Sequence, residues 1–274
     1  MIKELSTEIN EKDTEIAFSL QSGHFDELFR ENRIIQYKRK RVREHLLKYS
    51  KPNSSILELN SGTGEDAIFL AEAGHFVHAT DLSSGMQTEL KNKVEKSGLN
   101  KMISAELCSF TQLDSLKNRG PYDYIFSNFG GLNCTPDLDK VLDSFSGLLK
   151  PGGIVTLVII PKFCLWELLL IFKGKFTTAT RRWFSKNGVK AHIEGAYFNC
   201  WYYNPSYIIK QLKHSFDILD LEGLCTMIPP SYMENFPKNN PRIYHFLEEK
   251  EEIFKSRSPW KYWGDYFIIS FKKK

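Results

Sequence analysis

The sequence predicts an α/β protein with a doubly wound, mostly parallel sheet of seven strands, an antiparallel last strand and a cap inserted after the fifth strand. Three observations favour this fold class. Apolar, strand-like runs alternate with helix-like segments over residues 54–160. A glycine-containing turn joins the first run to the first of these helices. Two further strand-like runs follow after an irregular stretch of about forty residues. The 274 residues, 42% hydrophobic and 26% charged, have the composition of an ordinary globular protein.

The predicted elements follow one another in the order that such a sheet requires. After a polar leader, residues 24–50 are expected to be helical, with a break near Asn32. Gly74 and Gly98 mark the ends of two later helices, because glycine readily ends a helix. The expected strands are residues 56–59, 76–80, 102–108, 122–128 and 153–160, and the helices between them are residues 65–73, 84–96 and 138–150.

The alternation stops at Pro161 and returns near Tyr203. Within this stretch, residues 163–176 resemble a helix, and the residues after them mix bases with aromatics. A helix is then expected over 204–216, and two strands, 217–224 and 265–274, end the sheet as an antiparallel pair. We divide the chain into an N-terminal helical cap segment (1–50), a ligand-binding core (51–160), an inserted lid or substrate cap (161–203) and a C-terminal completion of the sheet (204–274).

Charge and cysteine content exclude several classes. A net charge of +4 is too small to predict nucleic-acid binding without a concentrated patch, and the basic residues of 37–48 are expected to form a solvated helix face. The five cysteines form no C-x-x-C pair, so we expect free thiols, no metal site and a reducing, cytoplasmic location. The first sixteen residues lack an apolar signal-peptide core, and Pro161, Lys162 and Glu167 interrupt the longest apolar tract.

The turn after the first strand points to a nucleotide-like ligand. In an open parallel sheet, ligands bind beyond the carboxyl ends of the strands, where this turn lies. Gly62 and Gly64 let the backbone approach a ligand closely, and Asp81 ends the second strand, where it can accept bonds from both hydroxyls of a ribose. A dinucleotide loop would have glycine where this chain has Asn60. Glu58, ahead of the turn, suits a zwitterionic ligand better.

Four motifs in this region resemble those of the class I S-adenosylmethionine-dependent methyltransferases. The family pattern E/D-x-G-x-G-x-G is similar to Glu58 through Gly64, "ELNSGTG". The segments "ATDLSSGM", "YDYIFSNFGGLN" and "LLKPGG" follow in the family's order, each at an expected strand end or in the turn before a strand, over residues 54–160. The resemblance implies a Rossmann-like methyltransferase fold, S-adenosyl-L-methionine as cofactor and S-adenosyl-L-homocysteine as product.

The resemblance also implies a role for individual residues. Asp81 would hold the ribose, Leu82 and Met86 would lie near the adenine, and Glu58 and Asn128 would lie near the methionine part. This chain departs from the family at Asn60, which replaces a glycine and needs a conformation that asparagine tolerates, and after strand three, where Ser109 and Phe110 stand in for an acidic residue. The implied cofactor contacts are Glu58, Asn60, Ser61, Gly62, Gly64, Asp81, Leu82, Met86, Ser109, Phe110 and Asn128.

The acceptor is expected to be a small organic molecule, apolar or aromatic, methylated on oxygen or nitrogen. "SNFGGLN" lacks the Asp/Asn-Pro-Pro-Tyr motif of the DNA amino-methylating enzymes, so we expect no nucleic-acid partner. A general base is optional, because the cofactor itself activates the methyl group. The candidates for it are His24, Tyr37 and His192. The residues expected to contact the acceptor are Tyr37, Phe129, Trp166 and Leu170.

Two other functions stay open at this stage. One is an NAD-type Rossmann oxidoreductase, which would need a third loop glycine where residues 65 and 67 are Glu and Ala. The other is a methyltransferase-like binding subunit without catalysis. The insertion of residues 161–203 is expected to be a lid over the acceptor, with a weak contact to a membrane surface as the second interpretation. The sequence leaves the oligomeric state open.

Overall fold

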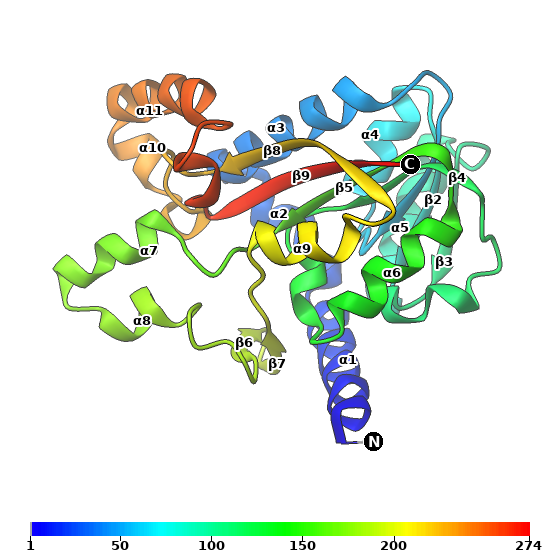
Figure 1. Ribbon diagram of the computed structural model, residues 1–274, viewed down its shortest axis with the longest axis horizontal. Helices are drawn as coiled ribbons and strands as arrows, with labels where there is room; N and C mark the ends of the chain where they lie inside the picture. The colour runs from blue at the N-terminus through cyan, green and yellow to red at the C-terminus, as the bar shows by residue number, and fades with distance from the viewer. Residues whose placement is uncertain (1) are drawn as a thin grey trace.

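The computed structural model describes residues 2–274, with side chains from residue 7 onward. Its centre is a seven-stranded sheet in the order β3-β2-β1-β4-β5-β9-β8 (Figure 1). The first five strands are parallel, β9 is antiparallel to β5, and β8 is antiparallel to β9. The strands are β1 (Ser55–Leu59), β2 (Phe76–Asp81), β3 (Ile103–Leu107), β4 (Tyr122–Ser127), β5 (Leu149–Ile159), β8 (Phe216–Leu224) and β9 (Tyr266–Lys273). The predicted fold class is confirmed.

Helices cover both faces of the sheet because side chains alternate along each strand. Leu57 and Leu59 of β1 join a core with Phe145 of α6 (Leu138–Leu148) and Ile208 of α9 (Pro205–Leu212). Ile56 faces the other way, into a core shared with α3 (Arg33–Tyr49), α4 (Glu65–Glu72) and α5 (Ser84–Ser97). Glu58 lies two residues after Ile56 and therefore on the same face of the sheet, so this otherwise apolar face carries one carboxylate.

The helical stretch expected over residues 24–50 is broken where the sequence indicated. α2 (Phe25–Arg30) ends before Asn32, and the Asn32 side chain accepts hydrogen bonds from the amides of Ile34 and Ile35 at the start of α3. None of the helices within residues 2–274 is long and apolar enough to cross a membrane.

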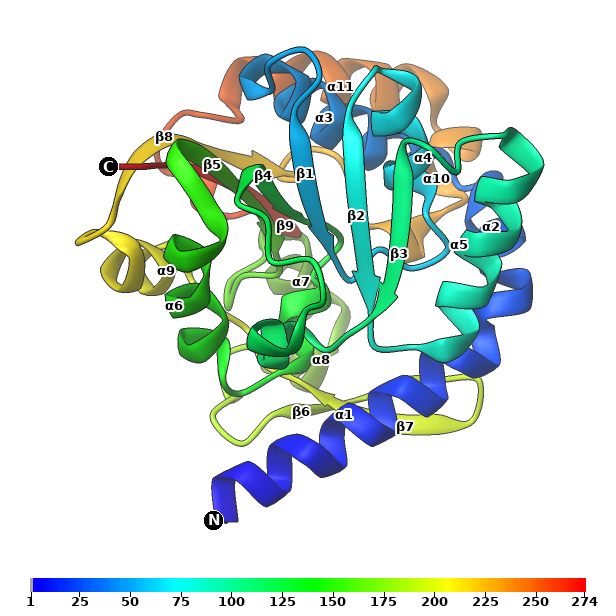
Figure 2. The same ribbon diagram turned by 90° about the vertical axis from the view of Figure 1, so that its right-hand side faces the viewer.

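The polar leader, which lies in the predicted helical cap segment of residues 1–50, forms α1 (Ile2–Gln21). This helix lies across the carboxyl ends of β1, β2 and β3, as Figure 2 shows. Residues 189–200 are also more regular than expected: β6 (Val189–Ile193) and β7 (Ala196–Cys200) form an antiparallel hairpin that contacts α1. Because α1 is polar overall, its composition does not reveal the face that packs against the rest of the protein, and that face is buried only through tertiary contacts.

Further helices lie in the insertion and in the connection between the last two strands. The insertion begins with α7 (Leu165–Leu169), η4 (Leu170–Lys173) and α8 (Phe176–Thr180), which lie beyond one end of the sheet in Figure 1. The connection between β8 and β9 contains α10 (Phe236–Asn239) and α11 (Pro241–Phe254). The five cysteines are free and all but Cys200 are buried, as expected.

Candidate functional site

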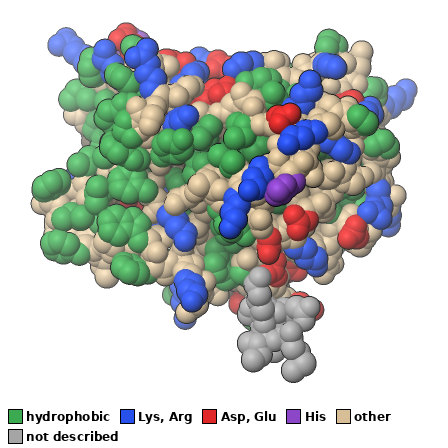
Figure 3. Space-filling view, viewed as in Figure 1, with side chains coloured by type: hydrophobic (Ala, Val, Ile, Leu, Met, Phe, Trp, Pro, Cys, Tyr) green, Lys and Arg blue, Asp and Glu red, His purple; other side chains and the backbone are tan. Residues whose placement is uncertain are grey.

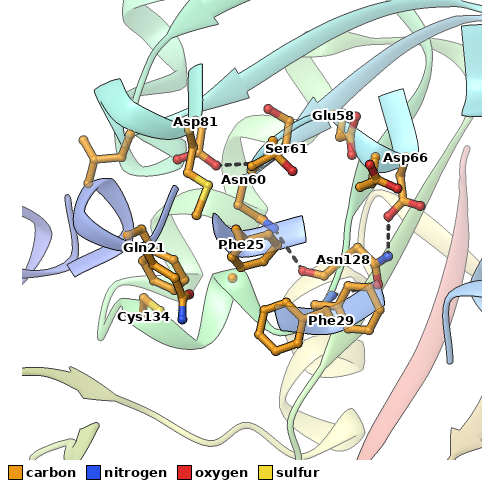
Figure 4. A pocket seen from close by; sticks show the side chains of 18 of the residues that line it. Gln21, Phe25, Phe29, Glu58, Asn60, Ser61, Asp66, Asp81, Asn128 and Cys134 are labelled. Carbon is orange, nitrogen blue, oxygen red and sulfur yellow. Dashed lines mark hydrogen bonds between the residues drawn. The ribbon is translucent and has the colours of Figure 1, made fainter. Parts of the chain in front are cut away.

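A cavity of about 410 Å³ lies at the carboxyl ends of β1, β2 and β4, within the size range of small-molecule sites. α1 and α2 cover the cavity, and their residues line it together with those of the loop after β1. Figure 4 shows Asp81 on one side of the loop after β1, and Glu58 with Asp66 on the other. The predicted residues that line the cavity are Glu58, Asn60, Ser61, Gly62, Asp81, Leu82, Met86, Phe110, Asn128 and Phe129.

The backbone of the loop is left-handed at three positions. Asn60 has a φ of 47°, which is the compatible conformation that its place in the motif required, and Gly62 and Gly64 have φ values of 54° and 82°. The two glycines differ in what surrounds them. A Cβ on Gly62 would meet no atom within 4 Å, whereas a Cβ on Gly64 would lie 2.8 Å from Cγ of Leu90. Gly62 therefore faces open space in the cavity, and Gly64 is needed for packing against α5.

The Asn60 side chain joins the ends of two neighbouring strands. Its Nδ2 donates to the carbonyl oxygen of Asn128 (2.9 Å), and its Oδ1 accepts from Ser127 Oγ (2.6 Å). Gly131 lies directly against this side chain, where a Cβ would clash with it. The replacement of the family's glycine by asparagine is thus accommodated by a matching glycine in the β4 loop.

Asp81 is half-buried at the end of β2 and is held by backbone donors. Its Oδ2 accepts from the amide of Gly62 and its Oδ1 from the amide of Ser83, both at 2.8 Å. Burial raises the pKa of this carboxyl group, although these backbone hydrogen bonds act in the opposite direction. Each oxygen retains lone pairs for donors from a ligand.

Glu58 is the least compensated charge in the cavity. Its Oε2 is buried and has no hydrogen-bond partner among the residues that the structure describes. Burial, followed by the nearby Asp66 carboxylate, raises its pKa well above the usual value, while Arg39 and Arg43 only partly offset this. Asp66 itself is bonded by Asn128 Nδ2 (2.7 Å) and by Arg43 Nε (2.8 Å). A buried carboxylate oxygen facing a cavity without a donor suits a ligand that carries a cationic or N–H group.

One part of the cavity wall is aromatic. This part includes Phe25 and Phe29 of α2, Phe129 and Tyr266. Lys38 also lines the cavity, and its Nζ lies 2.6 Å from Asp265 Oδ2 and 4.5 Å from the centre of the Tyr266 ring. Burial alone would lower the pKa of Lys38, but the Asp265 carboxylate more than offsets it, and the net shift is upward.

Four cavity residues come from α1, which sequence reasoning did not include in the site. They are Glu11, Thr14, Phe18 and Gln21, and the buried hydroxyl of Thr14 has no partner within the described part of the chain. Their spacing of three, four and three residues places them on one face of a helix, which is the signal that was available in the sequence. Ser109 does not line the cavity: its hydroxyl donates to Glu11 Oε1 (2.7 Å), which ties the β3 end to α1.

The three candidate bases lie outside the lining of the cavity. Tyr37 is packed in the core, where Arg41 Nη1 donates to its hydroxyl (3.0 Å). His24 is exposed and 3.1 Å from Glu194, and His192 lies against the ring of Tyr197. The structure therefore does not bring these side chains to the loop after β1.

The two acceptor contacts expected from the insertion, Trp166 and Leu170, are not among the residues that line the cavity either. The Trp166 ring packs edge-on against Phe236, with the ring centres 6.2 Å apart. From residues 161–203, the cavity takes Ile193 of β6. The hairpin, rather than the helical tract, is the part of the insertion that reaches the cavity.

A group of His45, Asp220 and Glu222 has atoms close enough together to hold a metal ion. Its carboxylates already have cationic partners, because Arg41 lies 2.6 Å from Glu222 and Lys48 lies 2.8 Å from Asp220. We interpret this group as an ion-pair network that joins α3 to β8.

Residues 56–153 match the model of a family described as methyltransferase domain. The chain is 33% identical over 122 residues to a demethylmenaquinone methyltransferase of Bacteroides fragilis and 30% identical over 103 residues to a tRNA 5-carboxymethoxyuridine methyltransferase of Escherichia coli. These matches cover 43% and 38% of this chain, and they span about half or less of the relatives, 49% and 39% of their lengths.

Solved structures with the same fold cover more of the chain. The crystal structure of the Burkholderia thailandensis 1,6-didemethyltoxoflavin-N1-methyltransferase, with 1,6-didemethyltoxoflavin and S-adenosylhomocysteine bound, has a TM-score of 0.57 and 14% identity. The likeness covers 98% of this chain and 90% of that one. A putative S-adenosylmethionine-dependent methyltransferase of Listeria monocytogenes has a TM-score of 0.55 and 19% identity, covering 84% of this chain and 96% of that one.

Proposed function

We propose that this chain, whose residues 56–153 match the methyltransferase-domain family, is a class I S-adenosylmethionine-dependent methyltransferase that transfers a methyl group to a small apolar or aromatic acceptor, on oxygen or nitrogen. One observation carries this proposal. A single cavity joins the buried carboxylate of Glu58, whose Oε2 has no hydrogen-bond partner among the described residues, and the half-buried carboxylate of Asp81 to a wall of aromatic rings. The first part suits the cofactor, and the second suits the acceptor.

The residues of the loop fit the cofactor in chemical character. Glu58 would neutralise the ammonium group of its methionine part, and Asp81 would accept bonds from its ribose hydroxyls. Gly62, with nothing within 4 Å of a Cβ, leaves room for a ligand against the backbone. When bound, S-adenosylmethionine supplies a methyl group activated by the adjacent sulfonium.

At the acceptor end, the chain's own residues orient the acceptor and exclude water. Phe25, Phe29 and Phe129 provide flat apolar surfaces for a ring, and α1 closes the cavity above them. Lys38 keeps its positive charge, because Asp265 raises its pKa. An ammonium group beside a phenolic hydroxyl lowers the pKa of that hydroxyl, so an oxygen acceptor would ionise without a dedicated base.

The acceptor preference rests on the cavity and not on the relatives, whose names include both a quinone-type and a tRNA methyltransferase. The aromatic wall favours a small ring compound over a nucleotide within folded RNA, because the cavity lies beneath α1 and α2. We also propose that the protein acts in the cytoplasm, on the basis of its free thiols.

Calorimetric titration with S-adenosylhomocysteine and with NAD⁺ tests the cofactor. Binding of the homocysteine compound alone supports the proposal, binding of NAD⁺ alone would indicate an oxidoreductase, and binding of neither would indicate a non-catalytic subunit. Glu58→Gln keeps the shape of the side chain and removes its charge, so it serves as the matched variant.

The acceptor is then tested with S-adenosylmethionine that carries a labelled methyl group. Transfer to phenols, quinols or aromatic heterocycles is expected, and Phe129→Ala should raise the acceptor KM more than it weakens cofactor binding. Transfer to bulk tRNA with none to the small compounds would refute the acceptor assignment and leave the cofactor assignment intact.

A further inference from the structure

The insertion exposes a cluster of large apolar side chains at one end of the molecule. Phe172 is 87% exposed, Phe184 77% and Phe176 62%. Figure 3 shows hydrophobic side chains gathered at the end where Figure 1 places α7 and α8. We call this cluster the insertion patch, and its members are Leu169, Phe172, Phe176, Trp183 and Phe184. With side chains of roughly 200 Å² each, the three phenylalanines alone expose on the order of 450 Å², an area typical of interaction sites.

Lysines surround the insertion patch in the sequence. Lys173 and Lys175 lie between Phe172 and Phe176, and Lys186 follows Phe184 by two positions. Residues 161–203 contain seven of the 37 Lys and Arg residues but only two of the 33 Asp and Glu residues, so their net charge of +5 exceeds the +4 of the whole chain. Among the side chains described, those of residues 7–274, these three exposed lysines form no ion pair.

The arginines of the insertion have a different role. Arg181 and Arg182 lie 2.6 and 2.8 Å from Glu167, and Arg182 is also 2.7 Å from Asp265 of the core. A backbone hydrogen bond from Leu165 to Trp263 (3.0 Å) adds a second link to the core. The insertion patch is therefore held by buried contacts behind it, and its rings point to solvent and not to the cavity.

We propose that the insertion patch docks onto the surface of an anionic lipid bilayer. Exposed phenylalanines would insert at the boundary between headgroups and acyl chains, while the flanking lysines attract the negative headgroups, as in interfacial segments generally. A second copy fits less well, because a symmetric contact would bring lysines of like charge together. Single-stranded RNA also fits less well, since Leu169 offers no stacking surface and both arginines are already paired.

The test is sedimentation of the full chain with vesicles. The vesicles contain either phosphatidylcholine alone or phosphatidylcholine with about one third phosphatidylglycerol, at about 0.1 M and about 0.5 M NaCl. The variants are F172S/F184S, which removes the most exposed rings, K173Q/K175Q, which removes charge alone, and F76S. Phe76 is a half-exposed phenylalanine at the start of β2 and is the matched control.

The expected result is binding to the anionic vesicles that is at least tenfold tighter than to neutral ones and that falls as salt rises. F172S/F184S and K173Q/K175Q should each lose at least tenfold, and F76S should bind as the parent does. The affinity for S-adenosylhomocysteine without vesicles should be unchanged in all variants, which shows that they fold and separates this proposal from the proposed function.

Three results would overturn the proposal. The first is the absence of sedimentation with anionic vesicles at low salt. The second is binding of F172S/F184S to anionic vesicles with the same affinity as the parent. The third is loss, in F172S/F184S, of a dimer seen for the parent or of binding to a labelled single-stranded RNA, with no change in vesicle binding.

Discussion

Replacement of Gly62 by alanine is expected to weaken cofactor binding at a small cost in stability, whereas the same change at Gly64 should mainly destabilise the fold. Both positions have positive φ, and an alanine in the left-handed region costs about 1–2 kcal/mol. At Gly62 this strain is the whole cost, because a Cβ there meets no atom within 4 Å. The new methyl group would instead occupy cavity space beside the backbone.

At Gly64 the strain is joined by a clash. A Cβ would lie 2.8 Å from Cγ and 3.0 Å from Cδ1 of Leu90, a fully buried side chain. Overpacking of this kind adds about 1–3 kcal/mol. The expected loss of unfolding free energy is therefore about 2–5 kcal/mol for Gly64→Ala against about 1–2 kcal/mol for Gly62→Ala.

Gly74 provides the matched control. It has a φ of 90°, a Cβ there would meet nothing within 4 Å, and it lies beyond α4, outside the lining of the cavity. Gly74→Ala should therefore show the backbone strain alone and bind S-adenosylhomocysteine normally. Denaturant unfolding measures stability, and calorimetric titration of each folded variant measures affinity. Gly62→Ala should lose at least tenfold in affinity, which is about 1.4 kcal/mol. Normal binding by Gly62→Ala, or Gly64→Ala being no less stable than Gly74→Ala, would refute the reasoning.

Three further predictions concern charged groups. Asp81→Ala should weaken binding of S-adenosylhomocysteine by about 1.5–3 kcal/mol, the usual value for hydrogen bonds to a charged group, and unchanged affinity in calorimetry would remove the ribose assignment. Burial and then Asp66 raise the pKa of Glu58, so a cationic ligand must displace a proton from it at low pH. The affinity of the parent should therefore rise with pH through this raised pKa, and titrations of Glu58→Gln over the same pH series should show no such rise. Burial alone would raise the pKa of Asp265, but Lys38 and Arg182 lower it to about 2. The ionised Asp265 side chain therefore contributes about 2 kcal/mol to the free energy of unfolding, fully above about pH 4 and progressively less toward pH 2. In acid unfolding, the stability difference between the parent and Asp265→Asn should shrink over that range.

Most of the fold could be read from local patterns. Each parallel strand combines an apolar run with a following turn, and Gly74 and Gly98 end helices at residues where the helix would otherwise expose its last carbonyl groups. The bounds of α1 and its place in the cavity wall were not predicted, and neither was the β6–β7 hairpin. Their residues are polar or mixed, and their order comes from contacts between the two elements and with the β3 end, such as Asn10 with the backbone of Asn199.

The sequence by itself determined the loop after β1, because a motif of adjacent residues carries both its conformation and its chemistry. Asn60 is left-handed and Gly62 faces open space, as a turn that approaches a ligand requires. Only the tertiary structure decided what closes the cavity and what faces solvent. Glu11 and Ser109 are 98 positions apart and meet through a hydrogen bond. Trp166 packs against Phe236, while Phe172 and Phe184 are left uncovered. A local pattern fixes which residues are apolar, but the partner that buries each of them is set by the packing of distant segments.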